Sequence, residues 1–294
     1  MNKEVKETTV KTAKKRSQLS MVWARFRRNK MAMAGLVIIL ILVILAIFAP
    51  FIAPYEYARQ NLDYRLQPPS GAHWFGTDHL GRDMFSRIIF GSRISLQVGL
   101  ISIGIATFIG GFLGAITGYY GGLLDNAVMR IMDIILAIPG ILLAITIIAI
   151  LGHGLTNVMI AVSIGMIPVE ARVVRASVIT VRDQEFVEAA KAVGTGDLRI
   201  IFKHILPNAM AQIIVQATLG VAGAILTAAA LSFLGIGIQP PTPEWGTMLS
   251  EGRMNLRDHW HVTVIPGLAI MTTILALNLL GDGLRDALDP KQKR

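Results

Sequence analysis

Six long apolar stretches constrain this chain more than any other feature of its sequence. A helix needs about 20 predominantly apolar residues to cross the ~30 Å hydrocarbon layer of a bilayer, and each stretch reaches or approaches that length. Charged residues make up only 16 % of the chain, against about 25 % in soluble domains. The sequence therefore predicts an all-α integral membrane protein with about six transmembrane helices. The stretches are Met33–Ile52, Leu96–Tyr119, Ile131–Leu151, Leu155–Pro168, Ala211–Leu234 and Val262–Leu280.

Lys and Arg residues are distributed unevenly among the segments that connect these stretches. If the N-terminus is cytoplasmic, six crossings place both termini in the cytoplasm and put 21 of the 28 Lys and Arg residues on that side. Positive charge is retained on the cytoplasmic side during insertion, so this orientation is the predicted one. The net charge of +9 then reflects topology and contact with anionic lipid headgroups, and no nucleic-acid partner is expected.

The apolar stretches divide the chain into five predicted parts. A cytoplasmic basic arm occupies residues 1–30, the first transmembrane helix 31–54, and an extracytoplasmic loop 55–93. A core of five helices covers 94–283 and includes a cytoplasmic loop at 181–212, and residues 284–294 form a cytoplasmic tail. Asp83 follows a turn-rich run in the outer loop, and we expect it to cap the helix that leads into the second crossing.

Small residues and prolines predict how the helices pack and bend. Gly110, Gly114 and Gly118 follow one another at four-residue steps, which lines one helix face with hydrogen atoms and lets a second backbone approach closely. Pro139 and Pro168 lie within the third and fourth stretches. Each proline removes a backbone donor and crowds the preceding turn, so both helices are expected to kink there.

The cytoplasmic loop at 181–212 is too long for a tight connection, and its pattern predicts short helices. Asp183 is expected to cap a helix over Gln184–Val193, and Asp197 to cap the next one. Gly194 breaks the first helix, and Leu206-Pro207 is expected to bend the chain toward the fifth crossing. One apolar face is predicted on the first helix, and such a face needs cover from lipid, from its own bundle or from a soluble partner. Its members are Phe186, Val187, Ala190 and Val193.

At this point the chain resembles a known family. Glu188-Ala189-Ala190, then Gly194, then Leu206-Pro207 are similar to the EAA loop of bacterial binding-protein-dependent ABC importer permeases. The resemblance implies the type I importer fold and a coupling helix that fits a cleft on a cytoplasmic ATPase subunit. The residues that it assigns to the ATPase-coupling loop are Phe186, Val187, Glu188, Ala189, Ala190, Gly194, Leu206 and Pro207.

Three further blocks resemble the dipeptide and oligopeptide branch of that family. They are His73–Asp78 with Gly81–Asp83, Gln239–Leu249, and Gly281–Pro290. Their order is similar to that of the second permease subunit in dipeptide, oligopeptide or glutathione systems of the inner membrane. The resemblance implies four kinds of partner: a second homologous permease, two ABC ATPase subunits, an extracytoplasmic substrate-binding protein and the lipid bilayer. It leaves the choice among dipeptides, longer peptides and glutathione open.

The sequence offers no chemistry of its own. No Gly-Lys pair occurs, so the chain is not expected to hold ATP in a P-loop; ATP and Mg²⁺ would be bound by the partner ATPases. No catalytic residue, bound cofactor or metal site is predicted, and a membrane-embedded enzyme is therefore disfavoured.

A secondary transporter driven by an ion gradient is the main alternative. It should show ionisable residues deep in the helices, whereas the acidic residues here are expected in loops or near helix ends. Asn278, Ser163 and Gln216 are the polar residues predicted within the crossings, and they are candidates for the translocation path. Arg130 and Asp133, three residues apart, are expected to pair with each other.

Overall fold

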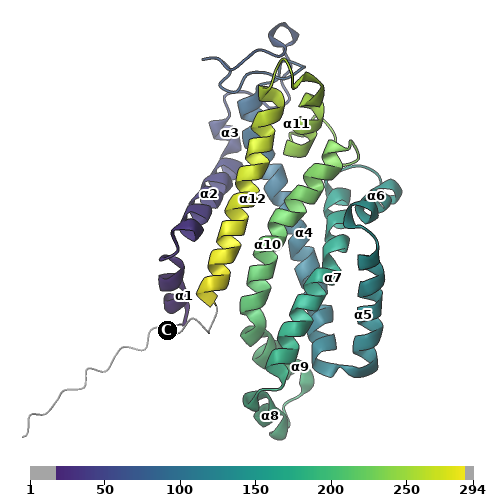
Figure 1. The fold of residues 1–294 in the computed structure, drawn as a ribbon. Coiled ribbons are helices and arrows are strands. Elements are labelled where there is room, and N and C mark those ends of the chain that lie inside the picture. Colours follow the sequence, from purple (N-terminus) through teal and green to yellow (C-terminus); the bar gives the residue numbers. More distant parts are fainter. Residues whose placement is uncertain (1–17, 289–294) are drawn as a thin grey trace, which may run out of the picture.

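A computed structural model describes residues 18–288, and within this range the chain is helical with no β-strand. The first seventeen residues of the basic arm and residues 289–294 of the tail lie outside the described part. Figure 1 shows the helices in chain order. They are α1 (Gln18–Phe26), α2 (Lys30–Ile47), α3 (Ala49–Ile52), α4 (Met84–Tyr120), α5 (Gly122–Ala137), α6 (Gly140–Leu151), α7 (Leu155–Arg182), α8 (Glu185–Ala192), α9 (Asp197–Arg199), α10 (Leu206–Phe233), α11 (Trp245–Gly252) and α12 (His261–Leu288).

Five segments are long and apolar enough to span a membrane, and a sixth span forms if α5 and α6 count as one. The third predicted crossing is not one continuous helix, because α5 and α6 meet at 90° across Ile138 and Pro139. Pro139 cannot donate a backbone hydrogen bond, so the break falls where a kink was expected. By contrast, α7 continues through Pro168 to Arg182, well past the predicted end of the apolar run.

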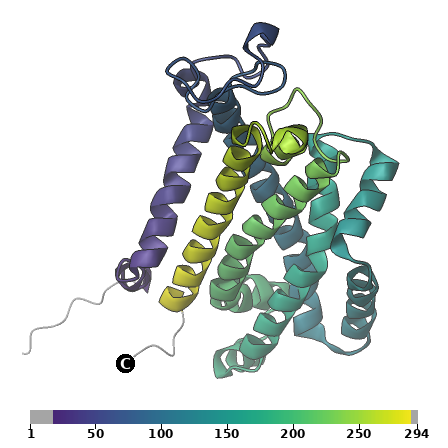
Figure 2. The same cartoon turned by 45° about the horizontal axis from the view of Figure 1, so that its top comes forward.

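The spanning helices lie side by side in one layered bundle. Figures 1 and 2 show α2, α12, α10 and α7 in that order across the bundle, with α5 and α6 beyond α7 and α4 behind α10. One end carries α3, α11 and the connection between α3 and α4, and we call it the α11 end. The opposite end carries α8, α9, α1 and the last turns of α12, and we call it the α8 end.

The basic helix α1 is attached to the bundle at the α8 end. Phe26 is buried, and the close approach of α12 at Gly283 leaves no room for a side chain beside Phe26 and Ala32. The Asn29 side chain accepts hydrogen bonds from the N–H groups of Met31 and Ala32, which caps α2. Asn29 thereby fixes the turn between the surface helix α1 and the first spanning helix.

The backbones of α4 and α7 approach each other along the glycine face of α4. A Cβ atom on Gly110 would lie 2.6 Å from the carbonyl oxygen of Ile167, and one on Gly118 would lie 2.9 Å from that of Arg175. A Cβ on Gly114, between them, would overlap the carbonyl oxygen of Ala171. Close van der Waals contact of this kind drives helix association in lipid, where apolar side chains gain nothing by leaving the surrounding acyl chains.

The variant Gly114→Ala should destabilise the protein, because the added methyl group meets backbone that cannot move independently. We expect a loss of about 2 kcal/mol, read as a lower midpoint of thermal unfolding in detergent. Gly104→Ala is the matched control, since it lies in the same helix with no atom within 4 Å of the added Cβ. Equal midpoints for the two variants would contradict this account of the α4–α7 contact.

Candidate functional site

The candidate site is the loop between α7 and α10, whose helices start and end differently from expectation. Asp183 terminates α7 and its carboxylate accepts a hydrogen bond from Arg182 Nε at 3.0 Å, so it does not cap α8. Gln184 occupies the N-cap position of α8 without a side-chain hydrogen bond. Asp197 is the first residue of α9, not its cap. Both capping predictions were wrong because each aspartate binds a partner other than the free N–H groups of its helix.

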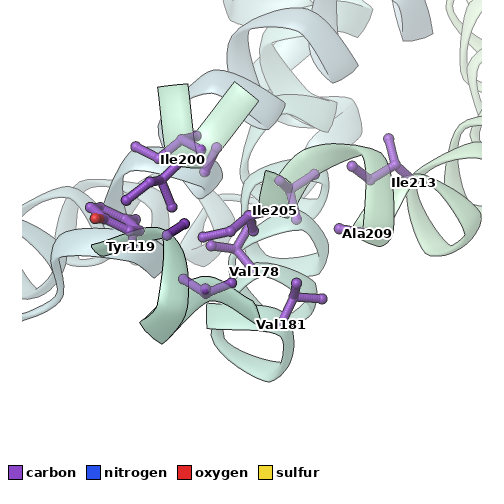
Figure 3. Close-up of a cluster of buried hydrophobic side chains, with 12 residues drawn as sticks. Tyr119, Val178, Val181, Ile200, Ile205, Ala209 and Ile213 are labelled. Carbon is purple, nitrogen blue, oxygen red and sulfur yellow. The ribbon is translucent and has the colours of Figure 1, made fainter. Parts of the chain in front are cut away.

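The predicted apolar face of α8 divides between two environments. Val187 and Ala190 are buried in a cluster with side chains of Ile200–Ile205, α4, α7 and α10, whereas Phe186 is 38 % exposed and Val193 is 81 % exposed. Figure 3 shows this buried cluster, with Tyr119 of α4 near Ile200, which follows α9. The loop is therefore held by its own bundle on one side and presents apolar side chains on the other.

Labelled residues of this cluster come from four elements. They include Tyr119, Val178, Val181, Ile200, Ile205, Ala209 and Ile213. Burial of so many branched side chains stabilises the loop, since each contributes about 1.5–3 kcal/mol when removed from water. This packing attaches the loop to α4, α7 and α10.

Hydrogen bonds join the same loop to the end of α4. The Tyr119 hydroxyl donates to Asp197 Oδ1 at 2.7 Å, and Arg182 Nη1 donates to the carbonyl oxygens of Gly118 and Tyr119 at 2.9 and 3.3 Å. The Lys191 ammonium lies 5.3 Å from the centre of the Tyr119 ring, within the range of cation–π attraction. Tyr119 thus contacts both halves of the loop.

Position 194 requires a glycine because of its backbone conformation, not because space for a side chain is lacking. Its φ is +78°, a value that side chains with a Cβ rarely adopt, and no atom lies within 4 Å of a Cβ placed there. The turn at Gly194 ends α8 and reverses the chain toward α9. Glu188 and Ala189 lie on α8 and are exposed.

Leu206 and Pro207 stand at the start of α10 without interrupting the helix. A π-helical segment, Ile200–Ile205, joins α9 to α10, and the N–H of Leu206 donates to the carbonyl of Ile201. A proline ring collides with the carbonyl four residues earlier in a regular α-helix. The wider π turn before Pro207 accommodates the ring, so the helical path continues where a bend was expected.

Comparison with known proteins identifies the family of this chain. Residues 110–294 match the family described as "Binding-protein-dependent transport system inner membrane component", which covers more than half of the chain. The chain belongs to this family. Residues 17–69 also match the "N-terminal TM domain of oligopeptide transport permease C". The protein is therefore a multi-pass inner-membrane permease subunit of an ABC importer, and family membership overturns the alternative of a secondary transporter.

Relatives of the permease share about half of its residues. The dipeptide transport system permease protein DppC of Alkalihalophilus pseudofirmus is 53 % identical over 269 residues, covering 92 % of this chain and 88 % of the relative. The glutathione transport system permease protein GsiD of Escherichia coli CFT073 is 49 % identical over 273 residues, covering 92 % and 90 %. The di/tripeptide transport system permease protein DppC of Pseudomonas aeruginosa is 48 % identical over 283 residues, covering 94 % and 93 %.

The fold of the permease is similar to that of a solved ABC transporter chain. An inward-facing structure of the MetNI methionine ABC transporter superposes with a TM-score of 0.59 at 20 % identity, covering 70 % of this chain and 98 % of that one. At this identity the likeness concerns the fold alone. It supports the predicted type I importer architecture of the membrane helices.

The three polar candidates for the translocation path do not lie together in the permease. Ser163 is buried and donates to the Met159 carbonyl in its own helix at 2.5 Å, whereas Asn278 is exposed on α12. Gln216 is half-buried on α10 beside Glu170. A cavity of about 230 Å³ opens between α6, α7 and α10. Its lining includes Gly140, Ala144, Gly165 and Thr227 and none of the three candidates.

Charged residues of α7 are placed by partners that the sequence pattern did not indicate. Arg172 pairs with Asp133 of α5 at 2.5 Å, so the predicted pairing of Asp133 with Arg130 was wrong. Arg175 forms a two-point contact with Asp125 of α5, with both distances 2.5 Å. Glu170 is buried in the middle of α7, which also contradicts the expectation that acidic residues would lie in loops or near helix ends.

A second charged cluster, at the α11 end, ties the connection before α4 to α11. Arg82 Nε lies 2.6 Å from Asp78 Oδ2, and both Arg82 and Arg87 contact the Glu251 carboxylate at 2.9 Å. Arg87 also pairs with Asp78. Asp83 caps α4 by accepting from the Ser86 N–H at 2.7 Å, as predicted. The sequence signal for this cluster was the turn-rich run itself, which gave no indication of Glu251.

The protonation of Asp78 follows from this cluster. Burial acts to raise the pKa of the Asp78 carboxyl, but the Arg87 and Arg82 guanidiniums and the N–H groups of Arg82 and Leu80 outweigh it and hold the pKa below its ordinary value. A carboxyl whose pKa is lower in the folded state stabilises the fold above the unfolded-state pKa. That contribution is lost as the pH falls through about 3.9 toward the folded-state value.

The variant Asp78→Asn should be less stable by about 3 kcal/mol near neutral pH, because two buried guanidiniums lose a charged partner. The difference from wild type should shrink as the pH falls below about 3.9, where the wild type loses the same charge. Thermal unfolding followed across a pH series measures this. Asp63→Asn, at an exposed aspartate of the same connection, is the control and should be as stable as wild type at every pH. If Asp78→Asn is less stable than wild type by the same amount at every pH, the charge of Asp78 is not the cause.

Proposed function

We propose that this chain is the second permease of an importer for dipeptides or other short peptides, driven by separate ATPase subunits through the loop between α7 and α10. The proposal rests on the difference in burial between the two sides of this loop. One side is buried against α4, α7 and α10, and the other exposes Phe186, Val193, Leu198 and Phe202. An exposed apolar patch on an otherwise anchored loop marks an interaction surface, and the family places an ATPase there.

The proposed orientation has both termini and α8 in the cytoplasm. Helix α1, the last turns of α12 and α8 lie at the same end of the bundle, and this end would carry most of the Lys and Arg residues. Retention of positive charge on the cytoplasmic side supports this choice. The α11 end, with its charged cluster, would then face the extracytoplasmic substrate-binding protein.

In the proposed mechanism the permease is moved by nucleotide that it does not itself bind. ATP and Mg²⁺ would be held by two ATPase subunits, and their closure would displace Phe186 and its exposed neighbours. The Tyr119–Asp197 hydrogen bond and the Arg182 contacts to α4 carry that displacement into the bundle. A second homologous permease would complete the translocation path. On this chain, Asn278 is exposed on α12 and remains a candidate residue of that path.

Short peptides are proposed as the cargo because relatives that share about half of the residues are described as dipeptide, di/tripeptide and glutathione permeases. All three cargoes are small and carry an α-amino group, a carboxylate and amide bonds. Uptake of labelled dipeptide and of glutathione by the reconstituted complex, each with its own binding protein, tests which of them is carried.

Replacing Gly194 with valine should lower the rate of peptide uptake at least tenfold, while the chain still inserts into the membrane. A β-branched residue is strongly disfavoured at a φ of +78°, so the turn after α8 must rearrange and the exposed face of the loop shifts. Gly196→Val is the control: Gly196 has a φ of −67° and equally open surroundings. Uptake by Gly194→Val at the level of Gly196→Val would contradict a role for this turn.

Replacing Phe186 with aspartate should weaken ATPase binding without unfolding the loop, because the side chain is exposed whereas its neighbour Val187 is buried. We expect at least a tenfold loss of ATPase subunits co-purified with the tagged permease. Leu62→Asp changes an exposed apolar side chain at the α11 end and should co-purify the ATPases normally. Native mass spectrometry of the gently solubilised complex gives the subunit ratio, and undiminished ATPase content in Phe186→Asp would remove the proposed docking surface.

A further inference from the structure

Glu170 lies where three spanning helices meet, and nothing in the proposed mechanism uses it. The side chain is 1 % exposed in the middle of α7. Its Oε2 atom accepts a hydrogen bond from the Thr107 hydroxyl of α4 at 3.3 Å, and the Gln216 side chain of α10 also bonds to it. The carboxyl group therefore contacts two of the helices that pack beside α7, α4 and α10.

Two glycines make the space that this carboxyl group occupies. A Cβ atom on Gly110 of α4 would lie 2.9 Å from Glu170 Cβ, and one on Gly220 of α10 would lie 3.6 Å from Glu170 Oε1. An alanine at Gly110 would crowd Glu170, whereas an alanine at Gly220 would only touch its carboxyl group and would collide with Ile103 instead. The space for the glutamate therefore depends chiefly on Gly110 of α4.

The surroundings of Glu170 hold no positive charge to balance a carboxylate. Within residues 18–288 no salt bridge includes Glu170, and the groups that face it are a hydroxyl and an amide. Arg172 and Arg175, the nearest arginines along α7, are paired with Asp133 and Asp125. An unpaired carboxylate at this depth costs several kcal/mol. A protonated carboxyl avoids that cost: it still accepts from Thr107, and its O–H can donate to Gln216 when the amide group of Gln216 turns its oxygen toward it.

We propose that Glu170 is a neutral carboxylic acid that ties α4, α7 and α10 together and so acts as a positioning residue for transport. These hydrogen bonds adjoin the α4–α7 contact at Gly110 and connect the closely packed helix pair to α10. Glu170 does not face the cavity between α6, α7 and α10, whose lining comes from other residues of α7 such as Gly165 and Met166. A direct contact of Glu170 with a cargo ammonium group is therefore not part of the proposal.

Infrared difference spectroscopy tests the protonation state without any transport assay. The purified wild type should show carbonyl absorption of buried protonated carboxylic acid, and Glu170→Gln should lose the part that belongs to Glu170. Any absorption from Glu244, which is equally buried, stays in both proteins and cancels in the difference spectrum. Glu185→Gln, at an exposed glutamate of α8, should keep the absorption of Glu170. A wild-type spectrum without this absorption, or one that Glu170→Gln leaves unchanged, would overturn the assignment of a neutral acid.

Transport by the reconstituted complex tests whether the hydrogen bonds of Glu170 to α4 and α10 matter for function. This experiment rests on the proposed function. Glu170→Gln, a neutral side chain of the same shape, should transport within about twofold of wild type with the same number of peptides per ATP hydrolysed. Glu170→Leu should lower that ratio at least fivefold, because α10 loses its hydrogen bond to α7. Gln216→Leu removes the partner instead and should lower the ratio in the same direction if Glu170→Leu fails to fold.

The outcomes separate the two proposals. Loss of transport in Glu170→Gln means that the charged form is needed, and a normal ratio in both leucine variants means that there is no tie; either result overturns the inference about Glu170. Absence of ATP-dependent uptake in the wild-type complex would instead refute the proposed function and leave the infrared result standing.

Discussion

The close contact between α4 and α7 is the interaction on which the rest of this structure depends. In lipid the hydrophobic effect does not hold helices together, so their association rests on backbone proximity and on polar contacts. Gly110, Gly114 and Gly118 provide the proximity. The polar contacts, Arg182 to the end of α4 and Glu170 to Thr107, lie along the same face. With these contacts, α7 stays helical over 28 residues although it contains charged residues and a proline.

This helix pair also connects the two ends of the molecule. α4 has 37 residues, about 55 Å at 1.5 Å per residue, and it takes part in both functional regions. Near its start Arg87 joins the charged cluster with Asp78 and Glu251, and near its end Tyr119 binds Asp197 in the loop after α7. A displacement of the loop thus reaches the α11 end through one continuous helix, which gives the proposed coupling a direct structural route.

Local patterns in the sequence predicted what depends on local physics, and tertiary partners decided the rest. Hydropathy located the spans, and Asp83 caps α4 as its position indicated. The sequence could not indicate that Asp197 would bind Tyr119 rather than cap a helix, nor that Asp133 would choose Arg172 over Arg130, because both partners are distant in the chain. Glu170 was missed for the same reason: its hydrogen-bond partners on α4 and α10, which accommodate a glutamate inside the apolar bundle, are distant in the chain. For the loop, the motif located the segment, whereas only the packing separated buried Val187 from exposed Phe186.

We infer that the loop after α7 and helix α4 move as one body when the ATPases bind nucleotide. The chain contains no cysteine, so Ala192→Cys and Phe108→Cys, both at exposed positions outside the proposed docking patch, can carry a pair of spin labels in the assembled complex. Electron–electron double resonance should give the same distance distribution without nucleotide and with ATP trapped, in a labelled complex that still hydrolyses ATP. A nucleotide-dependent shift in that distance would show that the loop moves independently of α4 and would contradict the account.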